Sequence, residues 1–319
     1  VASALENPWS LAFLPDGRML VTERPGRLRL VGSDGKLSAP ISGVPNVVAR
    51  GQGGLLDVVL DPNFAQNRYL YLSFAEPRAN GNGTSVARAR LSANGTALEG
   101  LSVIFRQMPT IASNMHFGSR LVFDRAGALF VTVGDRYSQR DQAQNPESHI
   151  GKVLRIKPEG GAAEGNPKKP GWQPEIWSIG HRNVQGAALH PQTGQLWTAE
   201  HGARGGDEIN TPKAGLNYGW PVITYGIDYS GVKIGDGTSK PGMEQPLFYW
   251  DPSIAPSGAA FYTGDRWPAW KNSLFVGALA GQLLSRLSTD GEKVTGEERL
   301  LGNLGERIRD VRQGPDGFL

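Results

Sequence analysis

The chain has 319 residues, of which 39% are hydrophobic, and a formal charge of only +3 with acidic and basic residues interspersed. No Lys or Arg run is dense enough to follow a phosphate backbone, which argues against a nucleic-acid partner. Cysteine is absent, which excludes disulfides, thiolate metal sites and cysteine nucleophiles. No apolar run is long enough to span a membrane.

One pattern recurs in chain order: an apolar strand, a turn rich in Pro, Asp or Gly, and a second strand rich in Leu, Val, Phe and Tyr. Its copies occupy residues 10–23, 56–76, 119–135, 186–200, 257–279 and 308–319. Further short strands are expected at 26–31, 84–92, 151–158 and 281–288. Together with 43 Gly and 22 Pro, which indicate many tight turns, this predicts an all-β protein.

Six copies, each spaced for four strands, predict a six-bladed β-propeller of four-stranded antiparallel blades. The alternative is a β-sandwich with a second domain. We expect residues 1–319 to form a single domain that is trimmed at both ends, because 308–319 stops where a strand begins. The first residues lack the charged and apolar regions of a signal peptide, so any such peptide was either removed or never there, and we expect removal. No long apolar stretch demands an obligate dimer, and a monomer or weak dimer is expected.

Polar residues lie just before the inner strand of successive repeats, where a propeller brings them to one face near its axis. His116 is the candidate general base, because imidazole titrates near neutrality. Three arginines form a candidate anion site, because planar guanidinium groups pair bidentately with carboxylates or phosphates. The alternatives are solvated loop residues and separate surface ion pairs. The candidates are Gln52, His116, Arg182, Asn183, Ser253, Arg307 and Arg309.

The turn at 201–210, HGARGGDEIN, combines glycines with Asp207 and Glu208. Glycines free backbone carbonyls to point inward, and carboxylates are hard oxygen donors, so this turn has the chemistry of a calcium site. The spacing is not that of an EF-hand. The alternative is an ordinary acidic turn.

Several segments together make the chain resemble the soluble quinoprotein sugar dehydrogenases, the glucose/sorbosone or aldose sugar dehydrogenase family. That family uses pyrroloquinoline quinone (PQQ) on a six-bladed propeller. The resemblance runs nearly end to end, and it implies PQQ and calcium as cofactors and a periplasmic or secreted enzyme. The segments are NPWSLAFLPDGRMLVTER, GQGGLLDVVLDPNF, GKVLRI, GHRNVQG, GGDEIN followed by LNYGWP, PSIAPSG and RIRDV.

The resemblance assigns roles to individual residues. His116 matches the base that removes the sugar hydroxyl proton, and Gln52 matches a neighbour that orients substrate or cofactor. For PQQ, it places Arg182 and Asn183 on the quinone oxygens and Arg307 and Arg309 on the carboxylates, with Ser253 where the family has Thr or Ser. For calcium, it implies the carbonyls of Gly202 and Ala203 at the ion that ligates PQQ, and Glu208, the Tyr218 carbonyl, Asp228 and Glu244 at a second ion.

Two departures distinguish this chain from the glucose dehydrogenase branch. Met115 stands where that branch has an Asp before the catalytic His, so the tautomer of His116 must be fixed by another group. Ala280 stands where that branch has a Lys on the cofactor. Losing that charge-assisted bond weakens PQQ binding by on the order of 1.5 to 3 kcal/mol. Both departures favour the aldose branch with broad sugar specificity.

The activity that the resemblance implies is oxidation of an aldose at C1 to a lactone. His116 would take the proton while hydride moves to PQQ. The developing negative charge would be stabilised by Arg182, Asn183 and calcium. An unidentified acceptor would then receive the electrons. Two alternatives remain: a calcium-dependent propeller lactonase or hydrolase, against which the arginines argue, and a non-catalytic propeller that binds sugar or a partner.

Overall fold

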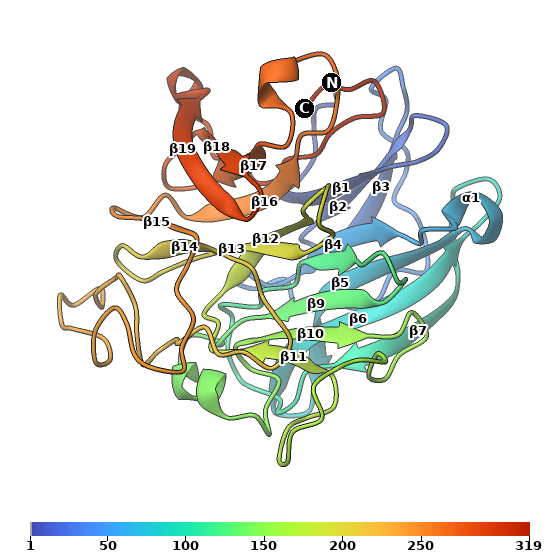
Figure 1. Cartoon of the computed structure of the whole chain (residues 1–319). Coiled ribbons are helices and arrows are strands. Elements are labelled where there is room, and N and C mark those ends of the chain that lie inside the picture. The colour runs from blue at the N-terminus through green and yellow to red at the C-terminus, as the bar shows by residue number, and fades with distance from the viewer. Residues whose placement is uncertain (1) are drawn as a thin grey trace.

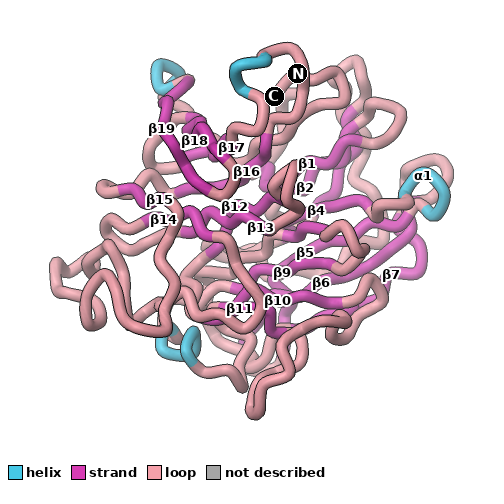
Figure 2. Tube along the Cα trace, in the orientation of Figure 1, coloured by secondary structure: helices cyan, strands magenta, loops and turns pink. Residues whose placement is uncertain are grey.

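The computed structural model describes residues 2–319, which are almost entirely strands and loops (Figure 1). Helical segments are short and lie at the periphery (Figure 2). They are α1 (Phe64–Asn67) and three single 3-10 turns, Arg140–Gln144, Pro268–Trp270 and Gly302–Leu304. Among the described residues, none of these helices has the length and apolarity needed to cross a membrane.

The strands form five antiparallel sheets, each a meander of strands consecutive in the chain. The first sheet contains β1 (Pro8–Phe13), β2 (Met19–Glu23) and β3 (Arg27–Val31). The second contains β4 (Leu55–Leu60), β5 (Tyr69–Arg78), β6 (Gly81–Leu91) and β7 (Leu98–Arg106). The third contains β8 (Leu121–Phe123), β9 (Leu129–Val133), β10 (Lys152–Ile156) and β11 (Ile176–Ile179).

The fourth and fifth sheets complete the array. The fourth contains β12 (Val184–Leu189), β13 (Leu196–Glu200), β14 (Asp207–Asn210) and β15 (Phe248–Trp250). The fifth contains β16 (Pro256–Phe261), β17 (Leu274–Ala278), β18 (Leu284–Asp290) and β19 (Lys293–Leu300). The all-β prediction is confirmed, and each of the first five repeat copies forms the first two strands of a sheet, as expected.

The prediction of six blades is wrong, because residues 2–319 form five sheets, of which the first has three strands. The sixth repeat copy, 308–319, forms no strand. Its charged residues explain the difference: Asp310 and Arg312 are drawn into ion pairs with residues of other sheets. This copy is therefore a segment without regular structure followed by a turn. With five sheets in residues 2–319, the fold is a five-bladed β-propeller.

Apolar clusters fill the spaces between successive sheets. One residue pair represents each cluster: Leu20 with Leu55 between the first and second sheets, Tyr71 with Leu129 between the second and third, Val153 with Ala187 between the third and fourth, and Trp197 with Leu274 between the fourth and fifth. Within the described residues no such cluster joins the fifth sheet to the first. Val311 packs on the fifth sheet instead. The segment around Val311 therefore lies in the one gap that apolar packing leaves between neighbouring sheets.

Candidate active site

His116 lies in the loop before β8 and is held by two neighbours. Its ring Nδ1 is 2.6 Å from Oδ1 of Asp135, and its backbone N–H donates to Oε1 of Gln52 at 2.8 Å. Its φ of 50° is in the left-handed region, which residues other than glycine seldom adopt and which often occurs at functional sites. The structure thus brings Gln52 and His116, both named as candidates from the sequence, into direct contact.

Asp135 fixes the tautomer of His116, a task for which Met115 has no suitable group. Its second oxygen accepts the indole N–H of Trp220 at 2.8 Å, and its side chain is buried. With Asp135 accepting the Nδ1 proton, Nε2 is the ring nitrogen left free to act as a base. Asp135 was missed from sequence, although it follows β9, which pairs with β8 in the same repeat.

Burial governs the protonation of His116. The side chain is 6% exposed, and desolvation of the cation lowers its pKa below the ordinary value of 6.5. Asp135 opposes this effect, while Arg182 and Arg136 add to it. The imidazole is therefore neutral at neutral pH, as a proton acceptor must be.

His116 opens onto a cavity of about 280 Å³, which we call the histidine cavity. Tyr137 lies edge-on to the imidazole with ring centroids 5.4 Å apart. At the rim, Arg140 faces Asp228 at 3.7 Å, and both side chains are largely exposed. The structure thus places Asp228 at the histidine cavity, whereas Glu208 lines a different cavity.

Arg182 and Asn183 present buried donors that lack partners. Arg182 Nη1 donates to the carbonyl of His201 at 3.1 Å and to that of Gly202, but its Nε has no partner among the described residues. Asn183 Oδ1 accepts the N–H of Gly118 at 3.1 Å, and its Nδ2 is likewise unpartnered in this part of the chain. Buried donors are normally satisfied, so both point to a bound acceptor.

A second cavity, of about 510 Å³, is called here the axial cavity. Gln52 lines it together with three arginines: the predicted Arg307 and Arg309, and Arg24, which was missed from sequence. Within residues 2–319 none of the three has a carboxylate within ion-pairing distance; Arg309 Nη1 donates instead to Oε1 of Gln185 at 2.7 Å. Burial and the neighbouring arginines lower the pKa of Arg309 to about 10. Three guanidinium groups without a carboxylate partner around one cavity favour an anionic ligand here.

Ser253 supports the acidic turn rather than the axial cavity. Its hydroxyl donates to Oδ1 of Asp207 at 3.1 Å and lies 3.5 Å from the carbonyl of Ala203. Asp207 also accepts the N–H groups of Ile254 and Ala255 at 2.7 and 2.8 Å. The side chain of Asp207 therefore fixes the turn in place.

The acidic turn encloses a cavity of about 10 Å³, called here the acidic cavity. That volume is about the size of one water molecule or small ion. Glu208 and Glu200 both accept from Asn210 Nδ2, each at 3.1 Å. Burial, with Glu200 adding repulsion, raises the pKa of Glu208 to about 8. A buried and a partly buried carboxylate that share one amide donor favour a cation between them.

The predicted calcium ligands are only partly brought together. Glu208, Tyr218 and Gly202 line the acidic cavity, whereas Ala203 lines the histidine cavity. Glu244 lies near enough to Tyr218 to influence its pKa, which burial raises. Glu200 was not predicted. No group of three or more His, Cys, Asp or Glu side chains in residues 2–319 is placed to hold a metal ion, so a cation here needs backbone carbonyls.

Comparison with known proteins gives consistent matches over the whole chain. A relative from Escherichia coli K12, aldose sugar dehydrogenase YliI, is 50% identical over 99% of this chain and 86% of its own length. The crystal structure of the E. coli soluble aldose sugar dehydrogenase in its apo form superposes with a TM-score of 0.95 at 49% identity, covering 98% of this chain and 92% of that one. The PQQ-bound aldose sugar dehydrogenase from Streptomyces coelicolor superposes with a TM-score of 0.82 at 31% identity, covering 98% and 86%.

The model of the Glucose / Sorbosone dehydrogenase family matches residues 5–319. The match includes the His116–Asp135 pair, the arginines of the axial cavity and the acidic turn. The chain therefore belongs to the glucose/sorbosone dehydrogenase family, and it is an enzyme of the aldose sugar dehydrogenase type.

Proposed function

We propose that this chain oxidises aldose sugars at C1 to lactones, with PQQ as the bound oxidant and broad sugar specificity. The observation that carries the proposal is the buried His116–Asp135 pair, 2.6 Å apart, which lines the histidine cavity. Gln52, which accepts the His116 N–H, also lines the axial cavity with its three unpaired arginines. The pair supplies a base, and the arginines supply a site for an anion. PQQ, which the S. coelicolor enzyme binds, is a quinone that carries several carboxylates.

The residues present fit PQQ in charge and in donor type. Arg24, Arg307 and Arg309 in the axial cavity match its carboxylates. The unpartnered Nε of Arg182 and Nδ2 of Asn183 match its carbonyl oxygens. When bound, PQQ supplies the two-electron oxidation by accepting hydride.

The chain's own residues then perform the acid–base and positioning work. His116 Nε2 accepts the proton of the sugar's anomeric hydroxyl. Asp135 keeps the other ring nitrogen protonated and stabilises the imidazolium that forms. Arg182 and Asn183 donate to oxygen where negative charge develops. The Trp220 indole holds Asp135 in place through its 2.8 Å hydrogen bond.

Calcium fits the acidic turn by donor chemistry. Glu208 and the carbonyl of Tyr218 would hold one ion in the acidic cavity, with Glu200 as a further donor and Glu244 close by. The carbonyls of Gly202 and Ala203 would hold the ion that contacts PQQ. Asp228 is a donor at the histidine cavity only. The electron acceptor is a separate molecule, and we place the enzyme in the periplasm or outside the cell.

Reconstitution tests the proposed function. Purified protein incubated with PQQ and calcium should reduce an artificial dye when glucose or xylose is added, and omission of PQQ should abolish the reduction. Removal of calcium by a chelator should lower the rate. Protein that stays inactive while it hydrolyses a lactone would show that the hydrolase alternative is correct.

The pH dependence of kcat/KM should follow His116. Because burial lowers the pKa of His116, the neutral base persists down to below pH 6.5, and kcat/KM should fall only below that pH. Asp135 raises this pKa, so Asp135→Asn should move the acid limb to still lower pH while also lowering kcat. Rate profiles of both proteins between pH 4 and 8 check this; an acid limb above pH 6.5 in the wild type contradicts it.

A further inference from the structure

Arg307 and Arg309 lie on a segment, residues 305–312, that belongs to no strand. Its backbone is tied to the fifth sheet alone. The N–H of Gly258 donates to the carbonyl of Arg309 at 3.1 Å, and the hydroxyl of Ser257 donates to that of Ile308 at 2.6 Å. The position of the two arginines therefore depends on what holds the segment's side chains.

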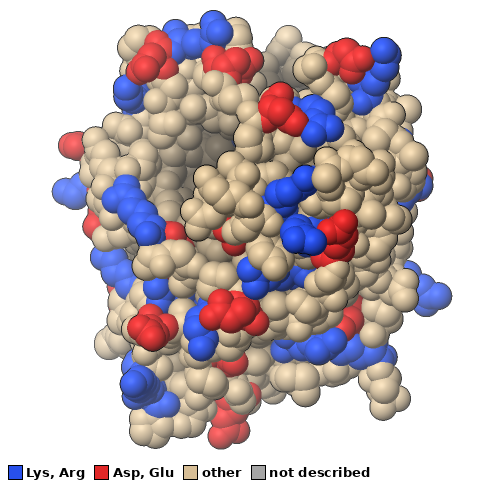
Figure 3. All heavy atoms as spheres, turned by 90° about the vertical axis from the view of Figure 1, so that its right-hand side faces the viewer, with Lys and Arg blue, Asp and Glu red and all other residues tan. Residues whose placement is uncertain are grey.

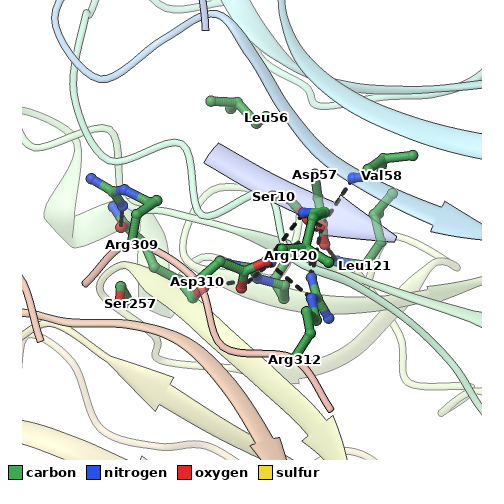
Figure 4. Close-up of polar contacts among 12 residues, drawn as sticks. Ser10, Leu56, Asp57, Val58, Arg120, Leu121, Ser257, Arg309, Asp310 and Arg312 are labelled. Carbon is green, nitrogen blue, oxygen red and sulfur yellow. Dashed lines mark hydrogen bonds and ion pairs between the residues drawn. The ribbon is translucent and has the colours of Figure 1, made fainter. Parts of the chain in front are cut away.

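A buried ion-pair network holds those side chains (Figure 4). We call Asp57, Arg120, Asp310 and Arg312 the axial quartet. Asp310 lies 3.2 Å from Arg120, and Arg312 lies 3.2 Å from Asp57, which also contacts Arg120 at 3.2 Å. Asp57 and Arg120 are almost completely buried. The quartet thus holds the segment through its side chains, in addition to its backbone contacts.

The quartet also connects the segment to every other sheet. Arg312 donates to the hydroxyl of Ser10 on β1 at 3.0 Å, and Asp57 is on β4. Arg120 precedes β8 and donates through Nε to the carbonyl of Gln185 on β12 at 2.9 Å. This network bridges the fifth and first sheets, where no apolar cluster does so in the described residues. Closure of the ring and placement of the segment therefore depend on the same ion pairs.

Charge explains why the arginines of the axial cavity stay free for a ligand. Two carboxylates and two guanidinium groups balance within the quartet. Arg309 adjoins Asp310 in sequence, yet the carboxylate of Asp310 forms its ion pairs with Arg120 and Arg312. Arg307 and Arg309 keep their full charge toward the cavity as a result.

We propose that the axial quartet positions Arg307 and Arg309 for the cofactor, so that cofactor binding and ring closure stabilise one another. The inference rests on the proposed function, in which the axial cavity takes PQQ. A ligand that binds only when residues 305–312 are held against the sheets stabilises that arrangement. By the same linkage, loosening of this segment lowers the affinity for the ligand.

Arg312→Gln is the variant that tests this positioning role. Arg312 does not line the axial cavity, and its side chain is 22% exposed, so the variant is expected to fold. Titration of the apo protein with PQQ, followed by tryptophan fluorescence, should give a Kd raised about tenfold or more. Arg312→Lys, which keeps the cation, should recover part of the affinity. Ser10→Ala, which removes an uncharged contact of Arg312, should weaken binding less but in the same direction.

Arg286→Gln is the matched control, because Arg286 pairs with Glu298 at 2.7 Å in the fifth sheet and is 17% exposed. Its Kd for PQQ should equal that of the wild type. Hydrogen exchange of apo protein gives a second readout: amides 305–312 should exchange faster in Arg312→Gln alone, and PQQ should slow them in the wild type. An unchanged Kd in Arg312→Gln overturns the positioning role by itself. Failure of wild-type protein to bind PQQ overturns the proposed function as well.

Discussion

Replacement of His116 by Gln should lower kcat/KM for glucose by about 10²- to 10⁴-fold, the usual contribution of a general base. Glutamine retains hydrogen bonding but cannot accept a proton near neutral pH. The PQQ-reconstituted variant should bind cofactor normally, so the loss should lie in kcat. Steady-state dye reduction measures it, and a loss of less than about tenfold would mean that another group is the base.

His149→Gln is a matched control for that variant. His149 is also buried, and its ring faces Glu175 at 3.4 Å, but it lines neither the histidine nor the axial cavity. The His149→Gln variant should keep the wild-type rate.

Combining His116→Gln with Asp135→Asn should lower kcat/KM little more than His116→Gln alone does, because the two residues act as a unit.

Replacement of Asp57 by Ala should lower the free energy of unfolding by about 3–5 kcal/mol, the cost of breaking a buried ion pair from one side. The Asp57 carboxylate accepts from Ser10 Oγ at 2.6 Å and from the N–H of Leu121 at 2.8 Å, besides its two arginines. Its removal leaves Arg120 buried with a single carboxylate partner. Urea unfolding of the apo protein measures the change.

Asp16→Ala provides the comparison for Asp57→Ala. Asp16 pairs with Arg18 at 2.6 Å, but its side chain is 52% exposed. Exposed pairs contribute at most about 1 kcal/mol, so this variant should unfold almost as the wild type does. Equal stability losses in the two variants would show that the axial quartet has no special role in closing the ring.

The strands could be predicted well from the sequence because each hairpin is specified by residues close together in the chain. Apolar residues on both sides of a Pro, Asp or Gly turn specify a hairpin, and five such copies form the first two strands of a sheet. The sixth copy carries the same turn, but Asp310 and Arg312 find buried partners on β4 and before β8. That outcome depends on contacts across the ring, which no local pattern encodes.

The site was predicted in part for the same reason. Four candidates stand just before inner strands or in the corresponding place: Gln52, His116, Arg307 and Arg309. Gln52 contacts His116 and lines the axial cavity with the two arginines. Asp135, Arg24 and Glu200 follow or end second strands, so only the assembled sheets reveal their partners. Their roles depend on packing between distant residues, as the Trp220 contact of Asp135 illustrates.

The face drawn in Figure 3 does not itself suggest a charged partner. Basic and acidic side chains are interspersed over the face in Figure 3, and that face is hollowed. Two exposed aromatic side chains, Tyr137 and Tyr229, line the histidine cavity.

An anaerobic single turnover tests the central claim most directly. Protein loaded with PQQ and calcium is mixed with glucose in the absence of any electron acceptor, and the absorption spectrum and products are followed. We predict that the spectrum of the oxidised quinone gives way to that of the reduced form, with lactone formed in an amount equal to the bound PQQ. A quinone spectrum that stays unchanged with both glucose and xylose would contradict the proposed sugar oxidation.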